Sequence, residues 1–333
     1  MPLGTQPLDV QKFRQAVISA YCYIERSRRR QGLSAFVRGA TGVELHPDRL
    51  DLPLRWRKPR RIFVNSLSDL FHEDIPDEFI DRVFAVMALT PQHTYQVLTK
   101  RPERMRAYMT RERTAHFSDG TPVTPRNPYQ SADFVIWAAQ KMVEDLPLKE
   151  QARLGEEAYP TGDSFDWPLP NVWLGVTCEN QRFADERIPI LLDTTAAVRF
   201  VSLEPLLGAI DLSCWLPFWF PMVEASGPVT TMANKAPLNW VICGGESGGP
   251  EYRRLVERCN CRIEGWGRGS SCEICYGTGW CPKPSALTWV RSLRDQCVAA
   301  SVPFFWKQWG GPKPKSGGRI LDGREWDEYP AAC

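Results

Sequence analysis

The chain has 333 residues, of which 43% are hydrophobic and 24% are charged. These values are typical of globular proteins and exclude a wholly disordered chain, and the length suffices for one α/β barrel or two smaller domains. The formal net charge of +2, from 41 Lys and Arg against 39 Asp and Glu, neither favours nor excludes nucleic acid, because local clusters of charge decide such binding.

The sequence lacks the usual signals of secretion and membrane insertion. No run approaches about 18 apolar residues, and the first ten residues have no basic start followed by an apolar core. We therefore expect a cytoplasmic protein without a membrane partner. In a reducing compartment, the 11 cysteines favour metal ligation or simple burial over a disulfide framework.

Two basic clusters lie in the first 61 residues. Residues 9–31 have a helical pattern and end in Arg26-Ser-Arg-Arg-Arg30, and the loop-like residues 43–61 end in Arg55-Trp-Arg-Lys-Pro-Arg-Arg61. A basic cluster that contains an aromatic residue is compatible with single-stranded nucleic acid. A solvated surface explains both clusters as well, so they do not decide the question alone.

Strands alternate with helices through the rest of the chain. Strands are expected at 61–65, 94–98, 171–176, 197–201, 240–243 and 302–306, and helices at 76–89, 102–109, 132–146, 182–192 and 286–299. This alternation favours parallel βαβ units. We predict an α/β fold, a TIM-like (β/α) barrel that is complete or partial; an open doubly wound sheet is the alternative.

The expected barrel extends over residues 43–311. A helical segment over 1–42 precedes it and a C-terminal tail over 312–333 follows it. Insertions interrupt the barrel at 110–170, 212–237 and 250–283. Connections as long as the first of these usually have a role near a site or are mobile.

Polar side chains follow each expected strand. Ligands of parallel α/β folds bind beyond the carboxyl ends of the strands, so these side chains are candidates for a site. They are Asn65, Ser68, Asp69, Lys100, Arg101, Glu179, Glu204, Glu246, Lys307 and Gln308. Carboxylates and lysines in one enclosed site can divide acid and base roles. The predicted catalytic residues are Glu204, Glu246, Lys100, Lys307 and Asp69, and a network of structural ion pairs is the alternative.

One apolar run ends abruptly in glycines and a carboxylate. Trp240 to Cys243 are apolar without alternation, as expected of a strand that is covered on both faces. Gly244 and Gly245 permit backbone conformations or a close ligand approach that a Cβ atom would prevent. The run Gly244–Gly249 lacks the spaced third glycine of a dinucleotide fingerprint.

Five cysteines have the spacing of metal ligands. They are Cys259, Cys261, Cys272, Cys275 and Cys281. Thiolate pairs that a short loop brings together match a tetrahedral structural zinc site, for which four of the five suffice. An iron–sulfur cluster or a thiol loop without a metal is the alternative.

Six separated motifs resemble the bacteriophage Gp-thirty-seven/Gp-sixty-eight family. They begin at Arg60, Gln96, Asn171, Arg199, Val241 and Phe304, and they read RRIFVNSLSDLFHED, QVLTKRPER, NVWLGV, RFVSLEPLL, VICGGES and FFWKQW. The likeness extends from about residue 43 to Pro330. It implies a relative of radical S-adenosylmethionine enzymes, in which three thiolates hold a [4Fe-4S] cluster and the open iron binds the cofactor.

The chain departs from this family at the N-terminal motif that holds the cluster, which in the family has three cysteines and ends in Cys-Tyr-Ala-Glu. Cys22-Tyr-Ile-Glu25 matches the end of the motif, but Ser19 stands where another cysteine is expected, and no cysteine precedes Cys22. One thiolate cannot hold the cluster. Either the start of this sequence is degenerate, truncated or mistranslated, or the protein has lost radical chemistry and kept the barrel. By analogy with radical enzymes, the resemblance assigns cofactor contact to Cys22, Gly244, Gly245 and Glu246.

Two functions remain open from the sequence. The first is a radical-type enzyme, or a descendant of one, that acts on nucleic acid or a nucleotide. The second is a non-catalytic phage accessory protein with a zinc knuckle, which binds nucleic acid or a protein partner encoded nearby through the basic clusters.

Overall fold

The structure is a computed structural model that describes residues 18–19, 43–64, 68–110, 112–113, 129–154, 166–217, 219–224, 227–232, 237–248, 255–259, 272–313 and 315–331. The chain divides into two compact units. Unit 1 comprises residues 1–174, 194–197 and 333, and unit 2 comprises residues 175–193 and 198–332. Each unit is described by itself below.

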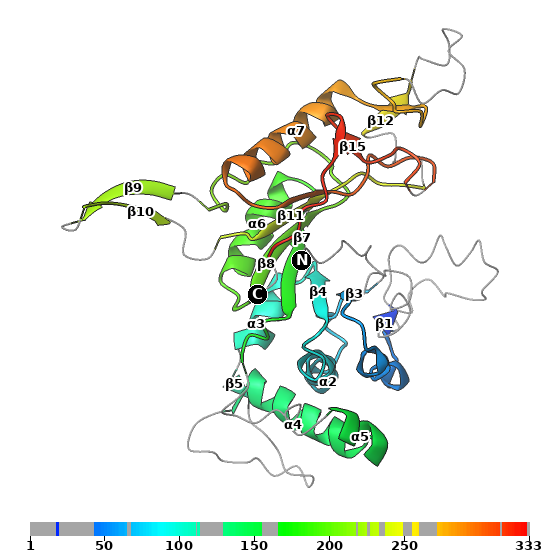
Figure 1. Ribbon diagram of the computed structural model, residues 1–333, viewed down its shortest axis with the longest axis vertical. Coiled ribbons are helices and arrows are strands. Elements are labelled where there is room, and N and C mark those ends of the chain that lie inside the picture. Colours follow the sequence, from blue (N-terminus) through cyan, green and yellow to red (C-terminus); the bar gives the residue numbers. More distant parts are fainter. Residues whose placement is uncertain are drawn as a thin grey trace. The chain divides into compact units, whose positions relative to one another are not determined.

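Six strands form a sheet with the order β14-β11-β8-β7-β4-β3 (Figure 1). They are β3 (Arg61–Val64), β4 (Thr94–Thr99), β7 (Val172–Thr177), β8 (Val198–Leu203), β11 (Trp240–Cys243) and β14 (Phe304–Trp306). The pairs β3–β4, β8–β11 and β11–β14 are parallel. The predicted mixed α/β class is confirmed. Within the described ranges the sheet has two end strands, β14 and β3, and a closed barrel is not seen there.

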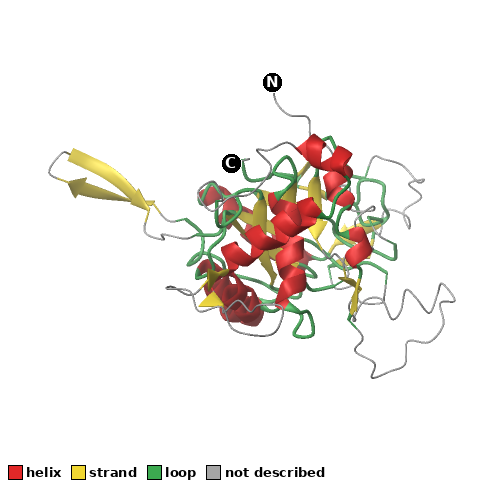
Figure 2. Cartoon of the chain, turned by 90° about the horizontal axis from the view of Figure 1, so that it is seen from below, coloured by secondary structure: helices red, strands yellow, loops and turns green. Residues whose placement is uncertain are grey.

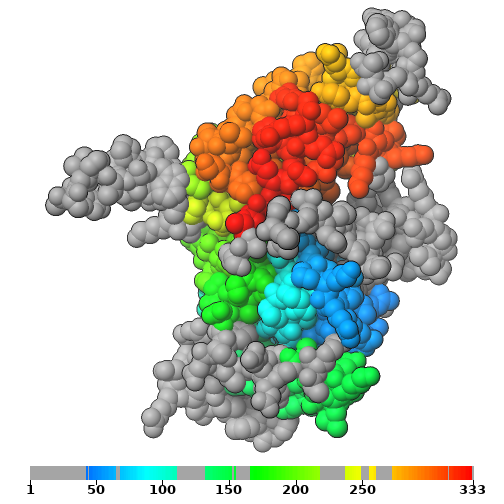
Figure 3. Space-filling view, in the orientation of Figure 1, coloured from blue at the N-terminus to red at the C-terminus, as the bar shows by residue number. Residues whose placement is uncertain are grey.

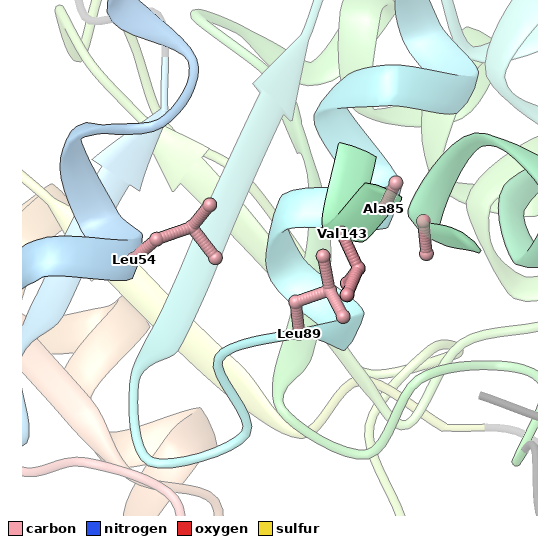
Figure 4. Packing of buried hydrophobic residues seen from close by; sticks show 5 residues of the cluster. Leu54, Ala85, Leu89 and Val143 are labelled. Atoms are coloured by element: carbon pink, nitrogen blue, oxygen red, sulfur yellow. The ribbon is translucent and has the colours of Figure 1, made fainter. Parts of the chain in front are cut away.

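The described residues of unit 1 form the helices α2 (Asp77–Ala88), α3 (Pro102–Thr110), α4 (Ser131–Glu144) and α5 (Leu148–Leu154). An apolar cluster joins α2 to α4. Ala85 of α2, Leu89 just beyond it and Val143 of α4 are buried together with Leu54 (Figure 4). Burial of such side chains contributes about 1.5–3 kcal/mol each for leucine and valine, which holds α4 against α2.

Unit 2 places α6 (Gln181–Leu192) and α7 (Pro284–Ala299) beside β8, β11 and β14. The helix α6 begins at Asn180, whose side chain accepts a hydrogen bond from the amide of Phe183 at 3.1 Å. The parallel register puts Trp240 beside Phe200, and their rings pack with centroids 5.6 Å apart. Tyr329 of the C-terminal segment stacks on Trp240 at 5.2 Å, so the aromatic residues form one continuous core.

The C-terminal residues are an integral part of unit 2. They form the short strands β15 (Ile320–Leu321) and β16 (Arg324–Glu325). Trp306 donates its amide to the carbonyl of Trp326 at 2.8 Å, and Arg291 of α7 pairs with Asp322 at 2.6 Å. Figure 3 shows the residues of α7, in orange, beside the red C-terminal residues on one face.

The insertions contain structure that periodicity did not indicate. The segment 212–237 was predicted as an insertion with no assigned elements, and within it β9 (Trp219–Glu224) and β10 (Gly227–Met232) form an antiparallel hairpin (Figure 2). Pro221 and Pro228 interrupt the alternation of apolar and polar residues that indicates a strand. Both strands of an isolated hairpin are edge strands, where proline is tolerated. The other short elements are β5 (Glu112–Arg113), β6 (Tyr129–Gln130), η1 (Pro47–Arg49), η2 (Leu52–Arg55), β12 (Val256–Arg258) and β13 (Trp280–Pro282).

The predicted N-terminal helix over 9–31 is wrong at two residues. Ile18–Ser19 form β1, which pairs antiparallel with β2 (Glu44–Leu45), because backbone pairing with a neighbouring segment overrides a weak local preference. The remainder of that prediction lies outside the described residues, and the predicted domain boundaries stay predictions. No helix in the described ranges is long and apolar enough to span a membrane.

Candidate functional site

A carboxylate and a lysine meet at the ends of two strands of unit 2. Glu204 follows β8 directly, Lys307 follows β14, and Lys307 Nζ lies 2.6 Å from Glu204 Oε2. The other carboxylate oxygen, Oε1, is buried and has no hydrogen-bond partner among the described residues. A buried carboxylate oxygen without a donor is costly, which makes Glu204 a candidate functional residue.

The neighbouring glycines are required by the protein's own packing. A Cβ atom on Gly244 would lie 2.5 Å from Glu204 Oε1, and one on Gly245 would lie 2.2 Å from the carbonyl oxygen of Trp309. The amide of Gly245 donates to the carbonyl of Gln308 at 2.8 Å, and the Gln308 side chain donates back to the Gly245 carbonyl at 3.0 Å. We call Glu204, Lys307 and the turn Gly244–Glu246 the strand-end site.

The third member of the turn, Glu246, is half-buried. Its carbonyl accepts a hydrogen bond from the amide of Gly311 at 3.3 Å. The predicted carboxylates Glu204 and Glu246 therefore follow the ends of two neighbouring parallel strands, β8 and β11. Cofactor contact by Gly244, Gly245 and Glu246 stays a prediction.

Three of the predicted cysteine ligands lie together in unit 2. The Sγ atoms of Cys259, Cys272 and Cys275 are within 4.8 Å of one another. The Sγ atoms of Cys259 and Cys272 are 3.8 Å apart, which is the edge of a tetrahedron of thiolates about 2.3 Å from a central zinc ion. The donor set and its size thus fit a metal ion such as zinc.

The backbone around Cys272 favours its thiolate form. The amides of Cys275 and Ile274 hydrogen bond to the Cys272 sulfur and lower its pKa to about 7. Burial, followed by the negative charge of Cys259, raises the pKa of Cys281 to about 11. Cys281 therefore lies close enough to the cluster to interact with it, although its Sγ donates to the Glu257 carbonyl at 3.7 Å.

A short hairpin holds the cysteines in place. The strands β12 and β13 pair Glu257 with Cys281, and the turn between the cysteines uses left-handed backbone at Tyr276 and Gly277, with φ of 47° and 79°. The hydroxyl of Thr278 donates to the carbonyl of Cys275 at 2.7 Å. We call the described residues 255–259 and 272–283 the knuckle. Cys261 lies outside the described residues, and a fourth ligand stays a prediction.

The chain matches one protein-family model over residues 16–265 and 272–330. That family is described as a protein of unknown function, DUF5131. The chain belongs to the DUF5131 family. No curated protein and no solved structure gives a significant match. The matched ranges include the strand-end site and all five predicted cysteine ligands.

In unit 1 of this DUF5131 chain, the predicted residue Asp69 accepts four hydrogen bonds. Asp69 Oδ1 accepts from the Thr99 hydroxyl at 2.7 Å and from the Phe71 amide at 3.0 Å. Its Oδ2 accepts from the Lys100 amide and the Arg101 guanidinium, both at 3.0 Å. Four donors give Asp69 the geometry of a loop-organising residue, and its predicted catalytic role stays a prediction, as does that of the exposed Lys100.

Glu179, a candidate at the end of β7, is engaged in an ion pair. Arg187 of α6 lies 3.1 Å from Glu179 Oε2, with side chains that are 14% and 9% exposed. Arg187 also donates to the carbonyl of Thr177 and stacks on Phe183 at 4.1 Å. Here the structural alternative of a buried ion pair describes the geometry.

Some residues of the sites were missed or cannot be placed. Asn65 and Cys22 lie outside the described residues. Leu255 and Thr278, which support the strand-end site and the knuckle, were not singled out. The sequence could have indicated Thr278, because it stands between two glycines, three residues after Cys275. A single leucine such as Leu255 has no such pattern around it.

Proposed function

We propose that this DUF5131 protein is an enzyme that binds a nucleotide, or a nucleotide unit of a nucleic acid, at the strand-end site of unit 2. One observation carries the proposal. The buried Glu204 Oε1 has no donor among the described residues while the other oxygen pairs with Lys307. A ligand that brings an O–H or N–H group to Oε1 would satisfy this atom.

The chemistry of the vacant acceptor selects the ligand class. A carboxylate oxygen only accepts hydrogen bonds, so the ligand must donate. Ribose hydroxyls and base amino groups are such donors, and nucleotides present both. The exposed side of Lys307, whose side chain is 55% exposed, supplies a cation for a phosphate or another anionic group of the same ligand.

In the proposed reaction, Glu204 acts as a base toward the bound donor group. Lys307 pairs with the carboxylate at 2.6 Å, and the Gly244 backbone packs closely against it. Such a fixed, partly desolvated base typically contributes about 10²–10⁴-fold to a rate. The half-buried Glu246, at the end of the same turn, would orient the remainder of the ligand.

The motifs shared with the phage Gp-thirty-seven/Gp-sixty-eight family support an origin among radical S-adenosylmethionine enzymes. The cluster of such enzymes does not fit this chain, since Cys22 is the single cysteine of its N-terminal segment. We therefore derive no step through a [4Fe-4S] cluster. S-adenosylmethionine itself contains a ribose and an amino group, and it belongs to the ligand class proposed here.

Zinc is the metal proposed for the knuckle. Cys259, Cys272 and Cys275 would hold it, with Cys261 or Cys281 as the fourth ligand. Four thiolates make a closed structural site, in which zinc contributes to folding rather than to the reaction.

A binding panel tests the proposed ligand class. Calorimetry with adenosine, ATP, GTP and S-adenosylmethionine should find at least one ligand, and its 2′,3′-dideoxy form or its form without the amino group should bind less tightly. Glu204→Gln should weaken binding by roughly tenfold or more, because a charge-assisted hydrogen bond is lost. Glu186→Gln, an exposed glutamate on α6, is the matched control. Equal affinity of Glu204→Gln and the unmodified protein would contradict the proposal.

An accessory nucleic-acid-binding protein is the second candidate, and one observation in unit 1 favours it. Arg60 lies over the ring of Trp56 at 4.5 Å, and Arg57 and Lys58 beside them are exposed. Aromatic rings and cations arranged in this way are typical of surfaces that bind single strands. The affinity for a short single strand should then fall steeply with salt and fall further in Arg57→Ala/Lys58→Ala; a flat salt response would count against this candidate.

A further inference from the structure

We propose that Leu255 and Thr278 of the knuckle are positioning residues, through which a metal ion on the cysteines fixes the shape of the strand-end site. The inference rests on the proposed function for its consequence in ligand binding, but its structural part stands independently. It concerns unit 2 alone, which contains both the knuckle and the site.

The first connection joins Leu255 to the Gly244–Glu246 turn. A Cβ atom on Gly245 would lie 2.9 Å from Leu255 Cδ1, so the leucine side chain presses directly against that glycine. Leu255 is 2% exposed, and its carbonyl accepts the amide of Lys283 at 2.8 Å. Because Leu255 and Lys283 close the base of the β12–β13 hairpin, the position of the leucine depends on the hairpin being formed.

The second connection begins at Thr278. Its amide and hydroxyl both donate to the carbonyl of Cys275, at 2.9 and 2.7 Å, so the threonine is attached to a predicted metal ligand. Its methyl group faces Gly318, where a Cβ atom would lie 3.2 Å from Thr278 Cγ2. Gly318 has a φ of 74°, a conformation that few other residues adopt without strain.

The residues 310–313 and 315–318, which we call the glycine loop, connect Thr278 to the strand-end site. The carbonyl of Gly318 accepts the amide of Trp309 at 3.0 Å. The backbones of Gly310 and Gly317 touch, since a Cβ on Gly317 would lie 1.9 Å from the Gly310 oxygen. A Cβ on Gly310 would in turn lie 2.1 Å from the carbonyl oxygen of Glu246. Backbone packed against backbone leaves little freedom, so a shift at Thr278 moves the turn.

The two connections reach the same turn from different sides. Leu255 supports Gly245, and the glycine loop supports Glu246. Gly244, next in the turn, is packed against Glu204 Oε1. Metal ligation that closes the knuckle therefore holds Glu204 Oε1 in place. Residues around a metal site and the metal ligands usually fix one another's positions in this way. Without the metal, the hairpin opens locally and both supports loosen.

Hydrogen exchange on the full-length protein tests this inference without any ligand. The amides of Gly245, Gly311 and Trp309 are hydrogen bonded in the turn and the loop. After zinc is removed with a chelator, these amides should exchange roughly tenfold faster or more, while the amide of Ala184 in α6, bonded to the Asn180 carbonyl, should not change. Unchanged exchange at the turn and loop, with zinc loss verified by elemental analysis, would overturn the inference.

Two variants that keep the cysteines decide the matter if chelation unfolds the protein. Thr278→Ser keeps the hydroxyl and removes the methyl that faces Gly318, so it should retain zinc while exchange accelerates at Trp309 and Gly311. Leu255→Ala should retain zinc and accelerate exchange at Gly245, and Leu255→Met should restore protection because it refills the space. Native exchange rates in both Thr278→Ser and Leu255→Ala would overturn the inference.

The consequence for ligand binding separates this inference from the proposed function. For the nucleoside ligand found by calorimetry, Thr278→Ser and Leu255→Ala should weaken affinity by roughly threefold to tenfold, and Leu255→Met should restore it. If no nucleoside binds, the proposed function fails while the exchange result still decides whether the knuckle positions the turn. If affinity stays unchanged although exchange accelerates, the link from the turn to the ligand is refuted.

Discussion

Arg187 and Glu179 form an ion pair inside unit 2, with the guanidinium nitrogen 3.1 Å from the carboxylate and with side chains that are 14% and 9% exposed. Removal of one partner leaves the other charged and buried without compensation, which costs about 3–5 kcal/mol in comparable pairs. We expect Arg187→Met to lower the free energy of unfolding by this amount, measured by urea denaturation followed through tryptophan fluorescence.

A pair on the same helix provides the control. Arg182 and Glu186 lie 2.8 Å apart, but their side chains are 79% and 48% exposed. Exposed pairs of this kind contribute less than about 1 kcal/mol, so Arg182→Met should leave the free energy of unfolding nearly unchanged. If Arg187→Met and Arg182→Met had equal effects, Arg187 would not have the buried structural role assigned to it.

Glycine at position 175 is required by the packing of β7 against a ring. A Cβ atom there would lie 2.5 Å from the ring of Phe200, which is fully buried and held by Trp240. Gly175→Ala should therefore destabilise the protein by about 1–3 kcal/mol through overpacking.

Gly208 is the matched control for this prediction. A Cβ atom at Gly208 meets no atom within 4 Å, so Gly208→Ala should change the free energy of unfolding by less than about 0.5 kcal/mol. Denaturation curves of the two alanine variants make the comparison direct. Equal curves would show that Phe200 yields to the added methyl group.

The repeated local units of the fold could be predicted from the sequence. The strand around Trp240 is a continuous apolar run, the strand around Phe200 is mostly apolar, and α2 has apolar residues at helical spacing, so the pattern alone located β11, β8 and α2. Once these strands were located, the polar residues that follow them could be predicted as candidates for a site. The Glu204–Lys307 contact required the order of the strands in space, because the two residues are 103 positions apart in the chain.

The insertions could not be predicted in the same way. The hairpin β9–β10 has prolines in both strands, which removes the alternation that signals a strand. The cysteine ligands were visible because their spacing is itself the signal. Their supports, Leu255 and Thr278, act through close contacts with glycine backbone, and sequence pattern does not report contacts between distant segments.

Metal content follows from the geometry of the knuckle. The three sulfur atoms of Cys259, Cys272 and Cys275 are within 4.8 Å of one another, so elemental analysis of the purified protein should find about one zinc ion per chain. Cys272→Ser/Cys275→Ser should lose it. Cys214→Ser, at an exposed cysteine remote in sequence from the cluster, should keep it; retention of zinc by the double variant would remove the knuckle from consideration.

The fourth ligand can be assigned by the same measurement. Cys281 lies opposite Glu257 in the β12–β13 hairpin, and the negative charge of Cys259 helps to raise its pKa. If Cys281 is the ligand, Cys281→Ser should weaken zinc binding substantially, by roughly 10-fold or more, while Cys261→Ser should have little effect. The reverse outcome would assign Cys261.

The N-terminal segment should not assemble an iron–sulfur cluster. Cys22 is the one cysteine of the segment, and such a cluster needs three protein thiolates when its fourth iron binds a cofactor. After anaerobic reconstitution with iron and sulfide, Cys22→Ala and the unmodified protein should have the same visible absorption spectrum. An absorption band that disappears in Cys22→Ala would contradict this expectation and restore the radical mechanism.

His93 should make the stability of unit 1 depend on pH. The side chain is 1% exposed, its Nε2 lies 3.3 Å from the Pro53 carbonyl, and its Nδ1 has no hydrogen-bond partner among the described residues. Burial lowers the pKa of His93 from its ordinary value of 6.5. The folded protein therefore keeps the ring neutral at a pH where the unfolded chain binds a proton.

The sign of the effect follows from proton linkage. Below about pH 6.5 the unfolded state binds more protons than the folded state, so the free energy of unfolding should fall as the pH is lowered from about 7.5 to 5.5. His93→Gln, whose side-chain amide can still donate to Pro53, should have a smaller slope over this range. Each unit by which the pKa is lowered corresponds to about 1.4 kcal/mol. Urea denaturation of both proteins at several pH values measures the difference, and identical slopes would mean that other groups set the acid sensitivity.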